Sequence, residues 1–158
     1  MSVDNYDDIL NATWDDIPVE HVLPTGGWLL RGDNAAFIRP KEEGKKAKVL
    51  FTYKAVQPTE TVRAEDLEEL PEGYDLSINN LQHQVFIESA ADWDNVRKHL
   101  AKHGITLTGN LFDERGKLAF NKAFRGSEIV ANLDQDNYQN DAGETIWKNK
   151  LNNFQRAE

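Results

Sequence analysis

Hydrophobic and polar positions alternate along most of this chain with the two-residue period of β-strands, and in one place they follow the period of a helix. The alternation should break near Gly32, where we expect the first strand to bend or bulge. A polar, glycine-containing turn from Asn140 to Gly143 should join the last two strands. The pattern predicts five strands: Trp28 to Ile38, Lys48 to Val56, Leu81 to Glu88, Ser127 to Leu133 and Glu144 to Leu151.

One helix is predicted between the third and fourth strands, from Ser89 to Gly104. Trp93, Val96 and Leu100 recur at helical spacing and give the helix one apolar stripe. Asp92 follows the first residue of the helix at the spacing of a capping box. Three strands, a helix and two strands is the order of an oligonucleotide/oligosaccharide-binding (OB) barrel. The sequence therefore predicts a mainly β domain, a five-stranded OB-like barrel with its principal helix between strands 3 and 4.

Charge separates an acidic arm from the rest of the chain. The net charge is −9, and residues 1 to 24 hold six acidic side chains and no lysine or arginine. We expect a flexible or partner-ordered arm over residues 1 to 24, one OB-like domain over 25 to 154 and a tail over 155 to 158. The chain has no cysteine, no signal-like start and no apolar run that could span a bilayer. A soluble, cytoplasmic protein without a membrane partner is expected.

No residue cluster in the sequence encodes a reaction. His99 and His103 lie one helical turn apart, but two histidines make at most half of a zinc site, and sequence alone cannot place a third ligand such as His83. We interpret both as surface histidines on a basic helix. The adjacent Asp15 and Asp16 should diverge rather than cooperate in acid/base chemistry. We expect no enzyme activity, no metal and no cofactor.

Strand parity places several basic side chains on the face of the sheet that points away from the core. Lys48 and Lys54 alternate with Phe51 and Tyr53 in the second strand, and Phe86 falls on the polar side of the third. Single-stranded nucleic acid needs such a charged track with exposed aromatic rings on which bases stack. The predicted nucleic-acid-binding residues are Arg31, Arg39, Lys45, Lys46, Lys48, Lys54, Phe86, Arg125, Tyr138, Lys148 and Lys150.

This basic face depends on one assumption about the fold. The first, second and last strands must be neighbours, as they can be in a small barrel. The larger aromatic side chains fall on the more apolar faces and are expected in the core. A solvated lysine face beside one exposed phenylalanine is the alternative. The aromatic residues assigned to the core are Trp28, Phe51, Tyr53, Trp93 and Trp147.

The acidic arm carries a second functional signal, a short acidic and aromatic stretch. Such a stretch can lie in a basic groove of a partner protein, with an apolar anchor. It can also fold back over the basic face of this chain, or serve only solubility. The predicted partner-binding residues are Trp14, Asp15, Asp16 and Ile17.

Three stretches of the chain carry a resemblance to a known family. Leu23 to Trp28 resembles a Leu-Pro-x-Gly-x-aromatic opening, and Phe51 to Glu69 with Val85 to Ile105 resembles a strand, linker, strand and helix. Gly126 to Lys150 is similar to the closing hairpin of phage-encoded single-stranded-DNA-binding proteins of OB type. The resemblance implies non-enzymatic, sequence-tolerant binding of single-stranded DNA in phage replication or recombination. It also implies partner proteins recruited by an acidic segment, which in bacterial relatives is C-terminal but here is N-terminal.

Two other functions stay open. One is a phage virion or assembly protein whose arm becomes ordered on neighbouring subunits. The other is an acidic DNA mimic that inhibits a host enzyme, indicated by acidic blocks at residues 4 to 20 and 60 to 75. Under the leading hypothesis the partners are single-stranded DNA and replication or recombination proteins, in the cytoplasm of an infected bacterial cell. Homo-oligomerisation and a preference for DNA over RNA are left open.

Overall fold

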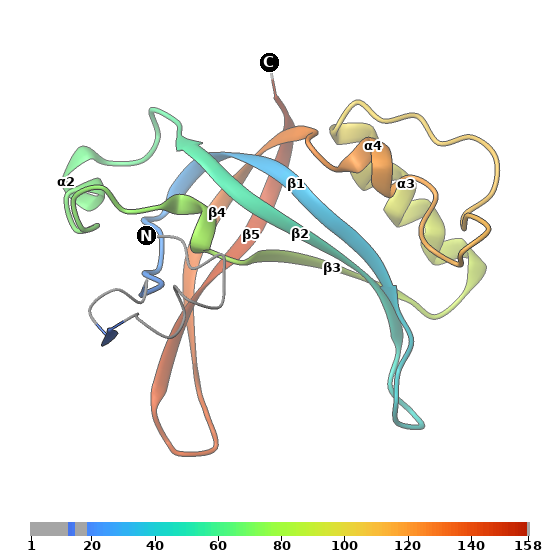
Figure 1. Ribbon diagram of the computed structural model, residues 1–158, viewed down its shortest axis with the longest axis horizontal. Helices are drawn as coiled ribbons and strands as arrows, with labels where there is room; N and C mark the ends of the chain where they lie inside the picture. Colours follow the sequence, from blue (N-terminus) through green and yellow to red (C-terminus); the bar gives the residue numbers. More distant parts are fainter. Residues whose placement is uncertain (1–12, 15–18, 158) are drawn as a thin grey trace.

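One sheet of five antiparallel strands forms the body of the chain in the computed structural model, which describes residues 13–14 and 19–157 (Figure 1). The strands lie in the order β3-β2-β1-β4-β5. The mainly β prediction with five strands is therefore confirmed. The strands are β1 (Gly26–Ile38), β2 (Ala47–Pro58), β3 (Leu81–Ile87), β4 (Glu128–Gln139) and β5 (Thr145–Arg156).

The helices are short and lie at two ends of the sheet. Figure 1 shows α3 and α4 together at one end, with α2 at the other. The described part of the chain contains no helix long and apolar enough to cross a membrane. The helical segments are α2 (Ala64–Leu67), η2 (Leu76–Ile78), η3 (Ala90–Asp92), α3 (Trp93–Lys102) and α4 (Asn121–Phe124).

The core lies between the inner face of the sheet and helices α3 and α4. In β2, Val49, Phe51 and Tyr53 are fully buried and alternate with partly exposed residues, as the two-residue period requires. Val96 and Leu100 of α3 and Phe124 of α4 are also buried in this core. Alternation in the strands and helical spacing in α3 thus lead to one apolar interior.

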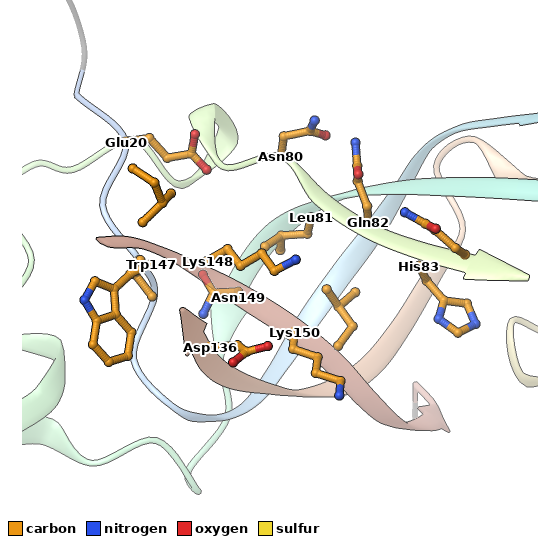
Figure 2. Close-up of a pocket in the computed structure, with 14 residues that line it drawn as sticks. Glu20, Asn80, Leu81, Gln82, His83, Asp136, Trp147, Lys148, Asn149 and Lys150 are labelled. Atoms are coloured by element: carbon orange, nitrogen blue, oxygen red, sulfur yellow. The ribbon is translucent and has the colours of Figure 1, made fainter. Parts of the chain in front are cut away.

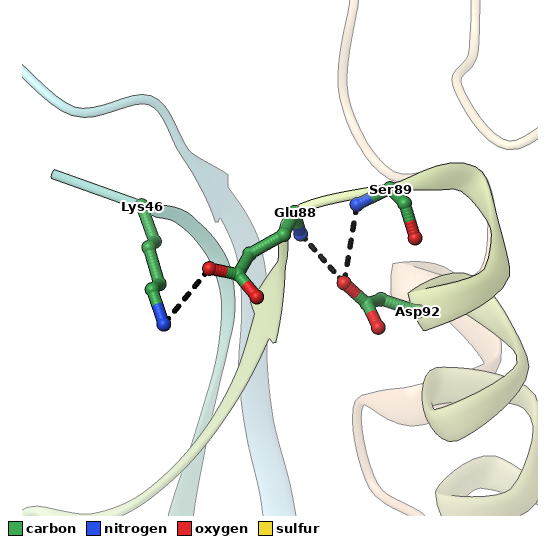
Figure 3. Close-up of polar contacts among 4 residues, drawn as sticks. All are labelled: Lys46, Glu88, Ser89 and Asp92. Carbon is green, nitrogen blue, oxygen red and sulfur yellow. Dashed lines mark hydrogen bonds and ion pairs between the residues drawn. The ribbon is translucent and has the colours of Figure 1, made fainter. Parts of the chain in front are cut away.

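The predicted helix is longer than the observed one. A 3₁₀ turn occupies residues 90–92, and the α-helix begins only at Trp93 and ends at Lys102. The predicted capping interaction is present, because the Asp92 carboxylate accepts hydrogen bonds from the backbone N–H groups of Glu88, at 2.7 Å, and Ser89, at 3.1 Å (Figure 3). The cap thus closes over the 3₁₀ turn, and the α-helix follows it.

The sheet is open rather than a hydrogen-bonded barrel in the part of the chain that the structure describes. β3 and β5 are its two edge strands. β4 and β5 also run longer than predicted, to Gln139 and Arg156. The polar end of β4 pairs with the first half of β5 as a two-stranded hairpin, and the added end of β5 pairs with the start of β4, where Arg156 lies opposite Ile129. Backbone hydrogen bonds hold the strands together there, so the pairing does not require alternating hydrophobic side chains.

The domain begins before residue 25, where the arm was expected to end. Leu23 is fully buried. Its N–H donates to Asn149 Oδ1, and Asn149 Nδ2 donates back to its carbonyl oxygen, both at 2.9 Å. β5 continues through Arg156, so residues 155 and 156 are strand and not tail. The packed domain therefore includes the end of the predicted arm and the start of the predicted tail.

A bend in β1 occurs where the sequence predicted it. Pairing with β2 shifts register between Gly32 and Asn34. Gly32 lies so close to α4 that a Cβ atom there would be 2.4 Å from the carbonyl oxygen of Phe124. The Gly32 N–H donates to the Ser127 carbonyl at 2.8 Å, which fastens the bend to the segment after α4. Only glycine fits this approach without a backbone shift.

Candidate functional site

The outer faces of β1, β2 and β3 align side chains in rows across the sheet. Lys48 of β2 is paired with Phe86 of β3 on one side and with Ile38 of β1 on the other. Directly opposite residues of antiparallel strands point to the same face, so these three side chains are neighbours. The next row along consists of Ala36, Leu50 and Gln84.

A groove of about 540 Å³ lies at the end of this face, under the β1–β2 loop. We call it the sheet groove. Five cationic side chains and one carboxylate line it, together with two exposed apolar side chains: Phe86 is 51% exposed and Ile38 is 37% exposed. The groove therefore joins positive charge to an accessible aromatic ring. Its charged lining residues are Arg39, Lys41, Glu42, Lys45, Lys46 and Lys48.

Two of these lysines already have carboxylate partners. Lys45 Nζ lies 3.2 Å from Glu42, and Lys46 Nζ lies 2.8 Å from Glu88 (Figure 3). The hydrogen bond and the charge of Glu88 raise the pKa of Lys46, so this lysine stays charged. Exposed ion pairs of this kind contribute little to stability and exchange readily. Both ammonium groups can therefore turn to a phosphate.

Arg31 and Lys54, also predicted to bind, lie farther along the same face. They are cross-strand partners in β1 and β2, and Arg31 is also paired with Glu128 of β4. Neither of them lines the sheet groove. They extend the basic face toward β4.

Lys148 and Lys150 lie on β5 and not beside β1 and β2. The assumption that the last strand neighbours the first two is wrong, because β4 separates β5 from β1, and β4 and β1 together separate it from β2. The two lysines instead line a cavity of about 730 Å³ between the edge strands, opposite Gln82 of β3 (Figure 2). We call it the edge cavity. Its carboxylates, from Glu20 and Asp136, offset the two lysines.

The remaining predicted binding residues lie apart from the sheet groove. Tyr138, 49% exposed, is on the β4–β5 hairpin, where the Lys148 ammonium lies 5.3 Å from its ring centroid. Arg125 follows α4 and lines another groove, beside β1. Trp14 of the arm is 89% exposed. Asp15, Asp16 and Ile17 lie outside the described residues.

Trp147 is exposed, and its assignment to the core is wrong. It is 53% exposed, whereas Trp28, Phe51 and Tyr53 are fully buried as predicted. The pairing of β1 with β4 starts at Leu133, so none of the described strands lies beside the hairpin beyond that point. Trp93, also assigned to the core, is partly buried against it. Strand parity gave the correct face for Trp147, but the core does not extend as far as the hairpin.

The histidines of α3 are not surface groups, which corrects the interpretation made from the sequence. His99 is only 5% exposed. Tyr53 Oη lies 2.5 Å from Nε2 of His99 and 2.8 Å from Nε2 of His103. The His83 ring packs against His99, with centroids 4.5 Å apart. The signal in the sequence was the spacing from Val96 to His99 and His103, which continues the apolar stripe.

The hydrogen bonds around Tyr53 form one chain, in which the donor and the acceptor of each bond can be assigned. Ser127 Oγ donates to the Phe124 carbonyl at 2.6 Å, so it accepts from His103 Nδ1, at 3.0 Å. We therefore assign the neutral His103 a proton on Nδ1, which leaves Nε2 to accept from the Tyr53 hydroxyl. The Tyr53 oxygen then accepts from His99 Nε2–H.

All members of this cluster are neutral at physiological pH. Burial lowers the pKa of His99 to about 2 and the pKa values of His83 and His103 to about 4. Burial also raises the pKa of the Tyr53 hydroxyl. Among the described residues, no group of three or more histidine or carboxylate side chains is arranged to hold a metal ion. The cluster is therefore a polar network within the core.

Comparison with known proteins assigns the chain to no family. No protein-family model matches its sequence, and no curated protein is significantly similar to it. Its function must therefore be inferred from the surface of this chain.

Proposed function

We propose that this chain is a non-enzymatic, sequence-tolerant single-stranded-DNA-binding protein and that the sheet groove is its binding surface. The observation that carries the proposal is the half-exposed Phe86 ring beside Lys48, in a groove with four further cations. Sequence-tolerant binding of a single strand needs an aromatic face for stacking and cations for the backbone. The groove supplies both within a small area.

The connectivity supports an OB-type assignment. The order β3-β2-β1-β4-β5, with α3 between β3 and β4, is the order of an OB barrel opened between its third and fifth strands. The edge cavity lies at that opening. OB domains bind oligonucleotides with the face of strands 2 and 3 and with the loops that join strands 1 to 2 and strands 4 to 5. The sheet groove lies on the corresponding face, next to the first of these loops.

A role in phage replication or recombination is part of the same proposal. It is supported by the resemblance of three sequence stretches to phage single-stranded-DNA-binding proteins, and it places the protein in the cytoplasm of an infected cell. With a net charge of −9, the protein as a whole repels DNA, so binding depends on the local charge of the groove. The affinity should accordingly be sensitive to salt.

Fluorescence anisotropy with labelled oligonucleotides of different sequence tests the proposal. Binding at micromolar or lower concentration is expected in about 50 mM salt, with similar affinities for different sequences and a marked loss at about 200 mM. No binding in the lower salt would overturn the proposal. Binding that survives the higher salt unchanged would overturn the electrostatic part.

A second candidate function, mimicry of DNA, is favoured by the opposite end of the molecule. α2 and its flanking loops hold seven carboxylates against one cation, Arg63, whose guanidinium pairs with Glu65 at 3.0 Å. Most of these carboxylates are exposed. Mimicry predicts binding to a basic, DNA-binding protein and none to DNA, so the same anisotropy experiment separates the two candidates. The acidic residues are Glu60, Glu65, Asp66, Glu68, Glu69, Glu72 and Asp75.

A further inference from the structure

A second basic groove, of about 1020 Å³, runs along the edge of β1 beside α4. We call it the α4 groove. β1 pairs with β4 only as far as Arg31, so from there to Ile38 none of the described strands pairs with this edge of β1. Four cations and one carboxylate line the groove. The charged residues are Asp113, Arg115, Lys117, Lys122 and Arg125.

The side chain of Asn121 holds this groove in place. Its Oδ1 accepts a hydrogen bond from the Ala35 N–H at 2.8 Å, and its Nδ2 donates to Asn34 Oδ1 at 2.9 Å. Phe124, at the other end of α4, is fully buried in the core. α4 is thus fixed to the edge of β1 at both ends, and it presents Lys122 to solvent.

The cations of the α4 groove are unusually available to an anion. Within the described part of the chain, none of the four forms an ion pair with a carboxylate. The one lining carboxylate belongs to Asp113, whose Oδ1 accepts from the backbone N–H groups of Arg115, at 2.8 Å, and Lys117, at 3.0 Å. One oxygen of that carboxylate is therefore engaged within its own turn. The sheet groove, by contrast, has two of its five cations in ion pairs.

The two grooves meet on β1. Asn34 to Phe37 line the α4 groove, and Ile38 and Arg39 line the sheet groove. At about 3.3 Å per strand residue, Ala36 and Ile38 are about 7 Å apart, which is roughly the spacing of neighbouring phosphates in an extended strand. A strand that lies over Phe86 and Lys48 and crosses β1 would enter the α4 groove directly.

We propose that the α4 groove binds backbone phosphates of the same single nucleic-acid strand whose bases contact the sheet groove. This inference rests on the proposed function and extends its site across β1. The groove is a phosphate site rather than a second base platform, because its one aromatic side chain, Phe37, packs against Trp93 and Phe112 with ring centroids 5.7 and 5.5 Å away. The footprint of the protein is therefore longer than the sheet groove alone.

The test compares two variants that each lose two positive charges. Arg115→Gln with Lys122→Gln removes charge from the α4 groove. Arg97→Gln with Lys98→Gln removes the same charge from the exposed side of α3, outside both grooves. Anisotropy is measured with oligo(dT) of about 6 and about 16 nucleotides, and circular dichroism checks that both variants are folded.

The α4-groove variant is expected to bind the short oligonucleotide within about twofold of the wild type and the long one at least about tenfold more weakly. Its salt slope with the long oligonucleotide should fall by about 0.7 for each phosphate that is no longer neutralised, and the α3 variant should match the wild type. Unchanged binding of the long oligonucleotide, or equal losses for both lengths, would overturn this inference and leave the proposed function standing. If the wild type binds neither oligonucleotide, both this inference and the proposed function are wrong.

Discussion

Lys48 and Phe86 lie directly opposite each other on neighbouring strands β2 and β3, on the face of the sheet that points away from the core. The ring is half exposed, and both side chains line the sheet groove. A base stacked on this ring would have its backbone within reach of the ammonium group. This pair supplies both an aromatic face for base stacking and a cation for the phosphate backbone, which sequence-tolerant binding requires.

Replacing Phe86 by alanine should weaken oligonucleotide binding about 5-fold to 150-fold, since a stacked base contributes about 1 to 3 kcal/mol. The free energy of unfolding should change little, because the ring is 51% exposed. Anisotropy and urea denaturation measure the two effects. Trp147→Ala is the matched control, since Trp147 is as exposed but lies outside the groove. If both variants bind equally, Phe86 is not the stacking residue.

Replacing Lys48 by glutamine should weaken binding and reduce the salt dependence, whereas Lys54→Gln should have the smaller effect. Both lysines lie on the outer face of β2, but only Lys48 lines the sheet groove. Each phosphate that a variant no longer neutralises lowers the slope of log K against log salt by about 0.7 for a single strand. Titrations at several salt concentrations give this slope. A larger effect from Lys54→Gln would indicate that the binding site lies nearer to Arg31 than to the sheet groove.

Acid should destabilise the fold below about pH 6.5 because of the histidine cluster. The pKa values of His83 and His103 fall from 6.5 to about 4 in the folded protein, mainly through burial, with the nearby charge of Lys102 adding to the shift at His83. The unfolded chain therefore binds more protons than the folded chain between these two values. Stability is full above pH 6.5 and decreases as the pH falls toward 4, by up to about 1.4 kcal/mol per pH unit for each histidine. Urea midpoints that stay constant from about pH 7.5 to about pH 5 would contradict this network.

Replacing Gly32 by alanine should destabilise the protein by about 1 to 3 kcal/mol, the usual cost of overpacking. The new Cβ would lie 2.4 Å from the Phe124 carbonyl oxygen, which is backbone and cannot turn aside. Thermal denaturation measures the loss. A variant as stable as the wild type would show that α4 can move away from β1, and the α4 groove would then have no fixed geometry.

Local alternation was enough to predict the faces of β2 and β3. It placed Phe51 and Tyr53 inside and Phe86 outside, because strand parity depends only on neighbouring residues. The pattern could not show that the β4–β5 hairpin extends beyond β1, so Trp147 was assigned to the core. The same limit applies to Lys148, since pairing between distant strands leaves no mark on either strand alone.

The histidine cluster and the α4 groove could not be predicted, for different reasons. His99 and His103 are polar, so sequence reasoning assigns them to the surface unless a buried hydrogen-bond partner is known. That partner is Tyr53, which lies 46 residues before His99 in the sequence. The α4 groove is formed by a four-residue helix and a loop with no periodicity. Arg125 was predicted to bind, but the cations around it come together through the packing of α4 against β1, to which the hydrogen bond between Asn121 and Ala35 contributes.

The proposed binding surface can be mapped directly by following backbone amide NMR signals of the isotope-labelled protein during titration with oligo(dT) in low salt. Progressive shifts that concentrate at Arg39, Lys48 and Phe86 are expected if the sheet groove binds the strand. Absence of shifts at saturating oligonucleotide, or shifts confined to the β4–β5 hairpin or to α2, would contradict binding at this groove.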